Sequence, residues 1–169
     1  HGQFVLGSDF VLRGCIASNL DGVAGDEVIV LGRELGGLER GLAIQGFGPT
    51  GSLLFTRFIT NGNLAETGLT TVDVGNGSKN IVVYAREFFT NSRGPAFQVF
   101  DSGGNLLLVK FVLNPDFTAF QVFGANTTNS IGGQEIVTGT GDGGIGAGPV
   151  DQGWNKNGNL LLSRFVLNP

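Results

Sequence analysis

One stretch of this chain recurs at a fixed interval, and this recurrence constrains the fold more than any other feature. The stretch occupies 104–115 as GNLLLVKFVLNP, returns at 158–169 as GNLLLSRFVLNP and is recognisable at 51–59 as GSLLFTRFI. The leading glycines stand at 51, 104 and 158, so the repeat length is 53 and then 54 residues. A fixed period of this size is typical of repeat architectures, and we expect several copies of one structural unit.

The end of this stretch occurs once more than three repeats require. The phenylalanines at 4, 58, 111 and 165 are equivalent, with spacings of 54, 53 and 54 residues. We therefore expect the last strand of a preceding repeat at 1–8, followed by repeats at 9–61, 62–115 and 116–169. A surplus strand suits strand addition between molecules. The predicted assembly strand comprises Phe4, Val5, Leu6, Phe165, Val166 and Leu167.

Within each repeat, short apolar runs separated by glycine-rich and polar turns predict four strands. Glycine accounts for 30 of the 169 residues and charged residues for only 14%, as in an all-β chain with many turns. We expect three tandem four-stranded antiparallel blade-like repeats with almost no helix. First strands are expected at 10–16, 64–72 and 117–123, second strands at 27–30, 80–83 and 135–138, and third strands around the Gln-x-aromatic motifs at 45–47, 98–100 and 152–154.

The recurring stretch forms the fourth strand of each repeat, and it is apolar on both faces. Simple alternation places Leu106 and Leu108 on one face, and Leu107 and Val109 on the other. Because a strand with one wet face would alternate more cleanly, we expect the sheets to stack face to face and cover one another. A basic residue interrupts the strand in every repeat, as a snorkelling side chain at a sheet edge or, less favoured, in a buried ion pair. These residues are Arg57, Lys110 and Arg164.

Two segments together resemble a known family. The third repeat contains Phe-Gly-Ala-Asn at 123–126, Glu-Ile-Val-Thr-Gly at 135–139 and a glycine-rich run at 141–148. The second repeat contains Val-Phe-Asp-Ser-Gly-Gly-Asn-Leu-Leu at 99–107. In their order and period these motifs resemble the FG-GAP repeats of integrin-type β-propellers and of bacterial surface and secreted proteins. The resemblance implies a four-stranded propeller blade for each repeat and, in family members that bind calcium, an Asp-rich loop between the first two strands.

The first loop is the one candidate for a metal site. Asn19, Asp21 and Asp26 lie between the first two expected strands, and Ca²⁺ takes six to eight oxygen ligands of this kind. The corresponding loops at 73–79 and 126–130 keep one acidic residue and none. The alternative is a polar turn whose side chains bond their own backbone. Calcium is therefore the only cofactor that the sequence suggests.

Two loops contain glycosylation sequons, which begin at Asn76 and Asn126. In a secreted protein each would be an exposed acceptor, although such triplets also arise by chance in turns. The chain has no initiator Met, so His1 is expected to start a processed or partial chain. An extracellular or cell-surface location follows as an expectation, with a glycan as one prospective partner.

Several classes of function are disfavoured. The net charge of −4 and the absence of Lys/Arg clusters argue against a nucleic-acid partner, and no apolar run is long enough to span a membrane. The only histidine is His1 and the only cysteine is Cys15, so neither a Ser–His or Cys–His pair nor a zinc cluster can be assembled. We expect a protein that is not an enzyme.

Three blades are too few to close a propeller, which usually needs four to eight. The surplus strand and the two-sided apolar sheets favour a quasi-one-dimensional stack. The leading hypothesis is a non-enzymatic extracellular structural protein that forms filaments or long arrays with itself by sheet stacking and strand addition. The alternatives are an adhesive or carbohydrate-binding module, either a fragment of an FG-GAP propeller or a three-fold lectin-like fold.

Overall fold

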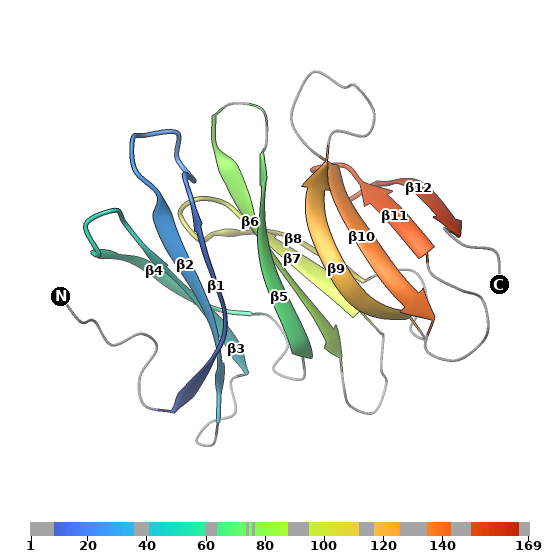
Figure 1. The fold of residues 1–169 in the computed structure, drawn as a ribbon, viewed down its shortest axis with the longest axis horizontal. Helices are drawn as coiled ribbons and strands as arrows, with labels where there is room; N and C mark the ends of the chain where they lie inside the picture. The colour runs from blue at the N-terminus through green and yellow to red at the C-terminus, as the bar shows by residue number, and fades with distance from the viewer. Residues whose placement is uncertain are drawn as a thin grey trace.

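All regular structure in the described part of the chain is β-strand. The computed structural model describes residues 9–35, 41–59, 64–73, 75, 77–87, 95–111, 117–125, 135–142 and 150–165, which contain no helix. Their strands form three four-stranded antiparallel sheets, each a meander in which strands adjacent in sequence pair with one another (Figure 1). The expected all-β class with three four-stranded units is therefore confirmed. The predicted strand at Phe4, Val5 and Leu6 lies outside the described residues.

Each sheet takes its strands from one stretch of the chain. The first contains β1 (Phe10–Ser18), β2 (Glu27–Glu34), β3 (Leu42–Phe47) and β4 (Leu53–Phe58). The second contains β5 (Leu64–Asp73), β6 (Lys79–Glu87), β7 (Pro95–Phe100) and β8 (Leu106–Phe111). The third contains β9 (Phe117–Ala125), β10 (Glu135–Asp142), β11 (Val150–Trp154) and β12 (Leu160–Phe165).

The same polar turn leads into the fourth strand of the second and third sheets. Asp101 Oδ1 accepts hydrogen bonds from the backbone N–H groups of Gly103 and Asn105, at 3.0 and 2.7 Å. Asn155 Oδ1 accepts two equivalent bonds in the third sheet. An Asx side chain that bonds to the backbone in this way stabilises a tight turn, which explains why an Asp or Asn precedes the recurring stretch.

A β-bulge beside this turn changes the faces that the leucines occupy. Leu106 pairs with Phe100, whereas Leu108 pairs with Val99, and Phe100 and Val99 point to opposite faces of β7. The expectation that Leu106 and Leu108 share a face was therefore wrong, because the extra residue of the bulge shifts the alternation by one. Equivalent irregularities occur between β3 and β4 and between β11 and β12.

The two faces of the three sheets can be matched through the register of their second and third strands. The side of the second sheet that carries Ile81 and Phe100 packs against the first sheet, and the side of the third sheet that carries Ile136 and Trp154 packs against the second. We call this side the incoming face of each sheet and the opposite side the outgoing face. Equivalent incoming pairs in the three sheets are Val28–Phe47, Ile81–Phe100 and Ile136–Trp154.

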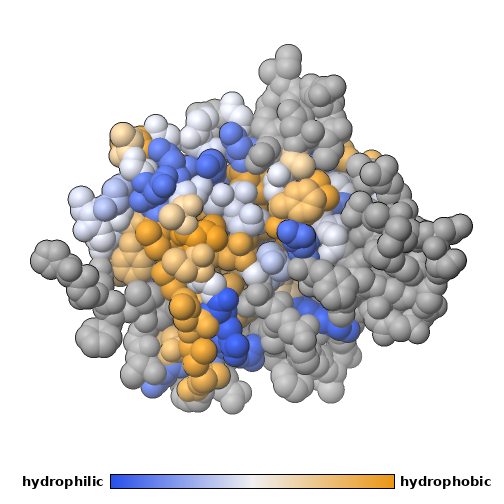
Figure 2. Space-filling view, viewed as in Figure 1, coloured by the Kyte–Doolittle hydropathy of each residue, from blue (hydrophilic) through white to orange (hydrophobic). Residues whose placement is uncertain are grey.

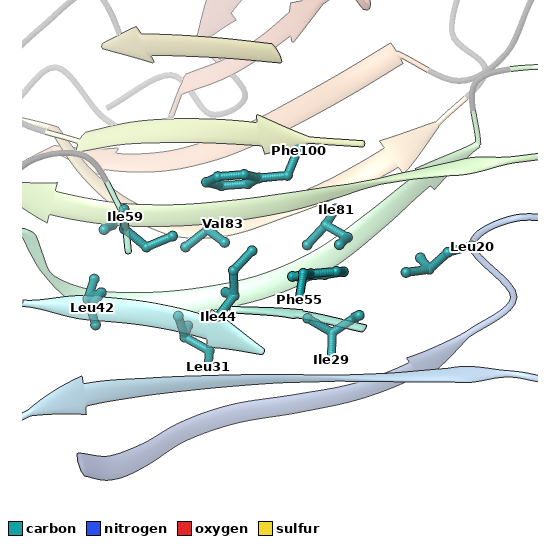
Figure 3. Close-up of a cluster of buried hydrophobic side chains, with 11 residues drawn as sticks. Leu20, Ile29, Leu31, Leu42, Ile44, Phe55, Ile59, Ile81, Val83 and Phe100 are labelled. Carbon is teal, nitrogen blue, oxygen red and sulfur yellow. The ribbon is translucent and has the colours of Figure 1, made fainter. Parts of the chain in front are cut away.

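Two apolar cores join the sheets. Between the first and second sheets, the outgoing residues Ile29, Leu31 and Ile44 meet the incoming residues Ile81 and Val83 (Figure 3). All five side chains are at most 1% exposed. Burying a side chain of this size contributes roughly 1.5–3 kcal/mol, so the junction between sheets is a principal source of stability. Between the second and third sheets the core comprises Val72, Val82, Phe97, Val99, Val122, Ile136 and Trp154.

The sheets approach most closely at their first strands and diverge toward their fourth strands. The most extensive contacts across sheets join β1 to β5 and β5 to β9, and these three strands lie side by side across the middle of the molecule (Figure 1). On the incoming face of the second sheet, Val83 and Gln98 are 1% exposed. On the same face of β8, Leu106 and Val109 are 45% and 37% exposed. Neighbouring sheets therefore form a wedge.

This divergence corrects one expectation about the fourth strand. We expected cover on both faces, yet the leucines that begin this strand are 38–55% exposed in every sheet. They lie on an edge strand, where the neighbouring sheets have separated. Arg57 is also exposed and donates a hydrogen bond to the Thr56 carbonyl, which agrees with a snorkelling side chain. The exposed leucines are Leu53, Leu54, Leu106, Leu107, Leu160 and Leu161.

Candidate functional site

The predicted metal loop between β1 and β2 is closed by its own side chains. Asn19 Oδ1 accepts the backbone N–H of Gly22 at 2.7 Å, and Asn19 Nδ2 donates to the Val23 carbonyl. Asp21 Oδ1 accepts the backbone N–H of Val23 at 2.8 Å. These are the contacts of the polar-turn alternative, in which short polar side chains bond nearby backbone groups.

A buried carboxylate anchors this loop. Glu27 Oε2 accepts the backbone N–H of Leu20 at 2.7 Å, and the Leu20 carbonyl accepts the backbone N–H of Lys79 in the second sheet at 2.9 Å. Lys79 Nζ also donates to Ser18 Oγ at 3.1 Å. The described residues contain no cluster of three or more His, Cys, Asp or Glu that could hold a metal. Calcium binding by Asn19, Asp21 and Asp26 thus stays a prediction, while the observed role of the loop is to connect two sheets.

The other candidate sites are only partly within the described residues. The sequon residues Asn76 and Asn126 lie outside them, as does His1, so glycosylation stays a prediction. Cys15 is a free thiol, exposed on β1. The described residues contain no helix long and apolar enough to cross a membrane. Of the predicted assembly strand, Phe165 ends β12, and Val166 and Leu167 lie beyond the described residues.

The most unusual surface is the incoming face of the first sheet. Gln45 is half-buried, whereas the equivalent Gln98 and Gln152 of the other two sheets are each 1% exposed. Phe47 stays buried, in a small cluster with Val30 and Ala43 on this face. The second and third sheets have a preceding sheet packed on this face, so the difference marks the first sheet as the open end of a repeated interface.

The turn glycines show the same difference. Gly104 and Gly158 are buried, whereas the equivalent Gly51 is exposed. A Cβ added at Gly104 would lie 2.6 Å from Cδ2 of Phe55 in the first sheet, and one added at Gly158 would lie 2.8 Å from Cδ1 of Leu108 in the second. Phe55 and Leu108 hold equivalent places in register, opposite Gly46 and Val99. Each junction thus seats a glycine on the fourth strand of the preceding sheet.

Cys15 occupies the first-strand position of this open face. By register it is equivalent to Leu69, which packs on the core between the first and second sheets, and to Val122, which is 4% exposed. On the same face and strand, Leu12 is 63% exposed. Figure 2 shows apolar side chains gathered on the left of the molecule, where Figure 1 places the first sheet. The incoming face of the first sheet therefore presents an apolar surface suited to another sheet.

Comparisons with protein-family models, with curated proteins and with solved structures gave no match. The resemblance to FG-GAP repeats therefore stays a prediction.

The outgoing face of the third sheet is open as well. Phe123 of β9 is 41% exposed, whereas Ile16, which is equivalent by register in the first sheet, packs against the core between the first two sheets. Val137 is 8% exposed, against 0% for the equivalent Ile29 and Val82. The described part of the molecule therefore ends in two different open faces, which correspond to the two sides of its internal junctions.

A groove lies where the second and third sheets diverge. It has a volume of about 430 Å³ and is lined by Leu107 and Leu108 of β8, Asn80 of β6, and Lys156 and Asn157 of the β11–β12 turn. The same junction between the first two sheets carries Phe55 in place of Leu108, and its ring is seated against Gly104.

The sequence did not identify the open-face residues, although a signal was present. Aligning the first strands by register makes Cys15 equivalent to Leu69 and Val122. The first repeat thus carries a small polarisable residue where each of the other two carries an aliphatic one. The turn glycines recur at 51, 104 and 158 in the sequence. Their seat on the preceding sheet could not be read from the spacing, because it depends on how two sheets pack.

Proposed function

We propose that this is a non-enzymatic structural repeat protein of the extracellular space or cell surface that assembles with itself. The outgoing face of its third sheet packs on the incoming face of the first sheet of the next copy. The single observation that carries the proposal is the greater exposure of Gly51 and Gln45 in the first sheet than of their buried equivalents in the second and third sheets.

The two open faces match because they are the two halves of an interface that already occurs within the chain. In that interface Leu69 of an incoming face packs on the core that includes Ile16 of an outgoing face. In the assembly Cys15 would take the place of Leu69, and Phe123 that of Ile16. An aromatic anchor such as Phe123 is a frequent energetic centre of protein interfaces. Strand addition by Phe4–Leu6 would reinforce the contact.

An extracellular location is supported by composition rather than by geometry. Charged residues make up only 14% of the chain, which suits sheets that bury both faces. The sequons at Asn76 and Asn126 would add polar cover if the protein passes through a glycosylating compartment.

Association can be tested with variants of exposed residues that leave the internal cores intact. Phe123→Asp alters the outgoing face of the third sheet, and Cys15→Asp alters the incoming face of the first. Val23→Asp is the matched control, since Val23 is 65% exposed in the first loop and belongs to neither face. Sedimentation velocity over a range of concentrations should show self-association for the natural chain and the control, and its loss in both face variants. A monomeric natural chain at every concentration would contradict the proposal.

A carbohydrate-binding function is the second candidate, and the groove between the second and third sheets favours it. Asn80, Asn157 and Lys156 offer hydrogen-bond donors and acceptors above the apolar side chains of Leu107 and Leu108. A sugar presents hydroxyl groups and an apolar ring face, which this combination suits. Glycan-array binding that is lost in Lys156→Ala and Asn157→Ala would support this function, and binding unaffected by both changes would place the site elsewhere.

A further inference from the structure

The internal junctions share the same wedge geometry. At both, the first strands are in close contact, β1 with β5 and β5 with β9. At both, the turn glycine of one sheet lies on the fourth strand of the preceding sheet, Gly104 on Phe55 and Gly158 on Leu108. A junction that repeats the same rotation between successive units cannot produce a straight stack. It curves the series of sheets around an axis on the side of the first strands.

A curved series either closes into a ring or, with a displacement along the axis at each step, continues as a helical filament. Closed propellers have four to eight sheets, and the part of this chain that the structure describes forms three. Among the described residues no extensive contact joins the first and third sheets, and the second sheet lies between them (Figure 1). Among multiples of three, only six falls within the range that propellers occupy.

We propose that two copies of this chain associate head to tail into a closed ring of six sheets, in which β1, β5 and β9 of both copies surround the axis. This inference depends on the proposed self-association. It adds the arrangement of the copies and the number of copies at which association stops. Each copy would place its third sheet against the first sheet of the other. The two junctions are then related by a two-fold axis, and the rotation closes instead of continuing into a filament.

Closure also explains why β1 carries exposed residues on its incoming face. On the incoming face of β1, Cys15 is exposed and Leu12 is 63% exposed, whereas β5 and β9 each contact the first strand of the preceding sheet. In the ring the incoming face of β1 gains such a neighbour, the partner's β9. Cys15 becomes covered as its equivalents Leu69 and Val122 are covered within one chain.

In the new junction Gly51 takes the position that Gly104 and Gly158 hold in the internal junctions. In the two internal junctions its equivalents are buried on Phe55 and Leu108. The corresponding place in the third sheet is position 162, which pairs with Gly153 as Phe55 pairs with Gly46. Ring closure would therefore seat Gly51 of each copy on β12 of the other, at this position.

Native mass spectrometry and sedimentation equilibrium of the 169-residue chain test the ring. The chain has a mass of 17.6 kDa, and we expect a discrete species of twice this mass that does not grow as concentration rises. Negative-stain class averages should show a ring with six radial units. Cys15, the only cysteine, gives an independent measurement. When nine in ten chains are in rings, its alkylation rate should fall about tenfold relative to the Phe123→Asp monomer, because only free chains react.

The alternative outcomes are distinguishable. Open filaments whose growth is blocked by Phe123→Asp would overturn the ring and leave head-to-tail association standing. A monomer at all concentrations, with Cys15 alkylated at the rate of the Phe123→Asp variant, would overturn both. A discrete dimer that survives both Phe123→Asp and Cys15→Asp would use a different surface and would also overturn the ring.

Discussion

Gly104, in the turn before β8, lies directly on the aromatic ring of Phe55 in the preceding sheet. A Cβ at Gly104 would come within 2.6 Å of Phe55 Cδ2, closer than carbon atoms approach without repulsion. The third sheet repeats the relationship with Gly158 on Leu108. The two interfaces between sheets thus share the same contact. In each, a glycine adopts the positive φ of the turn and also allows the two sheets to pack closely.

Replacing Gly104 with alanine should destabilise the fold through two separate effects. Its φ is 77°, where a Cβ costs on the order of 1–2 kcal/mol. The clash with Phe55 adds roughly 1–3 kcal/mol, as for other overpacked sites. Urea denaturation would measure the sum as a fall in the free energy of unfolding.

Gly77→Ala separates these effects. Gly77 has a φ of 82°, and nothing lies within 4 Å of a Cβ built there. This variant should show the backbone cost alone. Equal losses of stability for Gly104→Ala and Gly77→Ala would mean that the contact with Phe55 contributes nothing.

Trp154→Phe should be tolerated although Trp154 is 3% exposed. Its Nε1 is buried and has no hydrogen-bond partner among the described residues, and an unpaired buried donor costs about 1–3 kcal/mol. The equivalent positions carry Phe47 and Phe100. Losing this unpaired donor should offset the loss of ring volume, so the free energy of unfolding should change by less than about 1 kcal/mol, against about 3–5 kcal/mol for Trp154→Ala. A large loss in the phenylalanine variant would reveal an acceptor for the indole N–H.

The repeat period and the spacing of apolar runs were sufficient to predict the number and order of strands. Strand alternation failed at Leu106 because a bulge adds one residue to β8, and bulges depend on the local pairing of two strands rather than on composition. Cover on both faces was predicted for the fourth strand and holds instead for the second and third strands of the second sheet, which lies between the other two. Apolar content alone cannot tell an edge strand in a wedge from a central strand in a stack.

The candidate metal loop illustrates a different limit. Asn19 and Asp21 have the spacing of oxygen ligands, and the same spacing suits side chains that accept backbone N–H groups in a turn. The structure shows the second use at Gly22 and Val23. Likewise, the sequence shows Cys15 only as an unpaired cysteine. Its register, equivalent to that of Leu69, shows that it lies on an open sheet face.

Asp101→Asn should have little effect, whereas Asp101→Ala should weaken the turn before β8. Asp101 Oδ1 accepts two backbone N–H groups, and Asn155 performs the same role in the third sheet with its amide oxygen. The amide oxygen can therefore replace Oδ1, and the exposed Asn105 Nδ2, which donates to Asp101 Oδ2 at 2.9 Å, can turn to water instead. The methyl group of alanine leaves both backbone donors unpaired. We expect a loss of roughly 1–2 kcal/mol for the alanine variant in thermal or urea denaturation. Equal losses for asparagine and alanine would show that the charge of Asp101 matters more than its acceptor geometry.

Gly51→Ala should separate folding from assembly. Gly51 has a φ of 83° and is exposed, so the folded monomer should lose only the backbone cost measured in Gly77→Ala, on the order of 1–2 kcal/mol. In the assembled protein the same methyl group would meet the fourth strand of the partner's third sheet, as a Cβ at Gly104 meets Phe55. The dissociation constant from sedimentation equilibrium should therefore rise by at least about tenfold, equivalent to about 1.4 kcal/mol, while Gly77→Ala leaves it unchanged. Equal dissociation constants for Gly51→Ala and the natural chain would remove Gly51 from the interface.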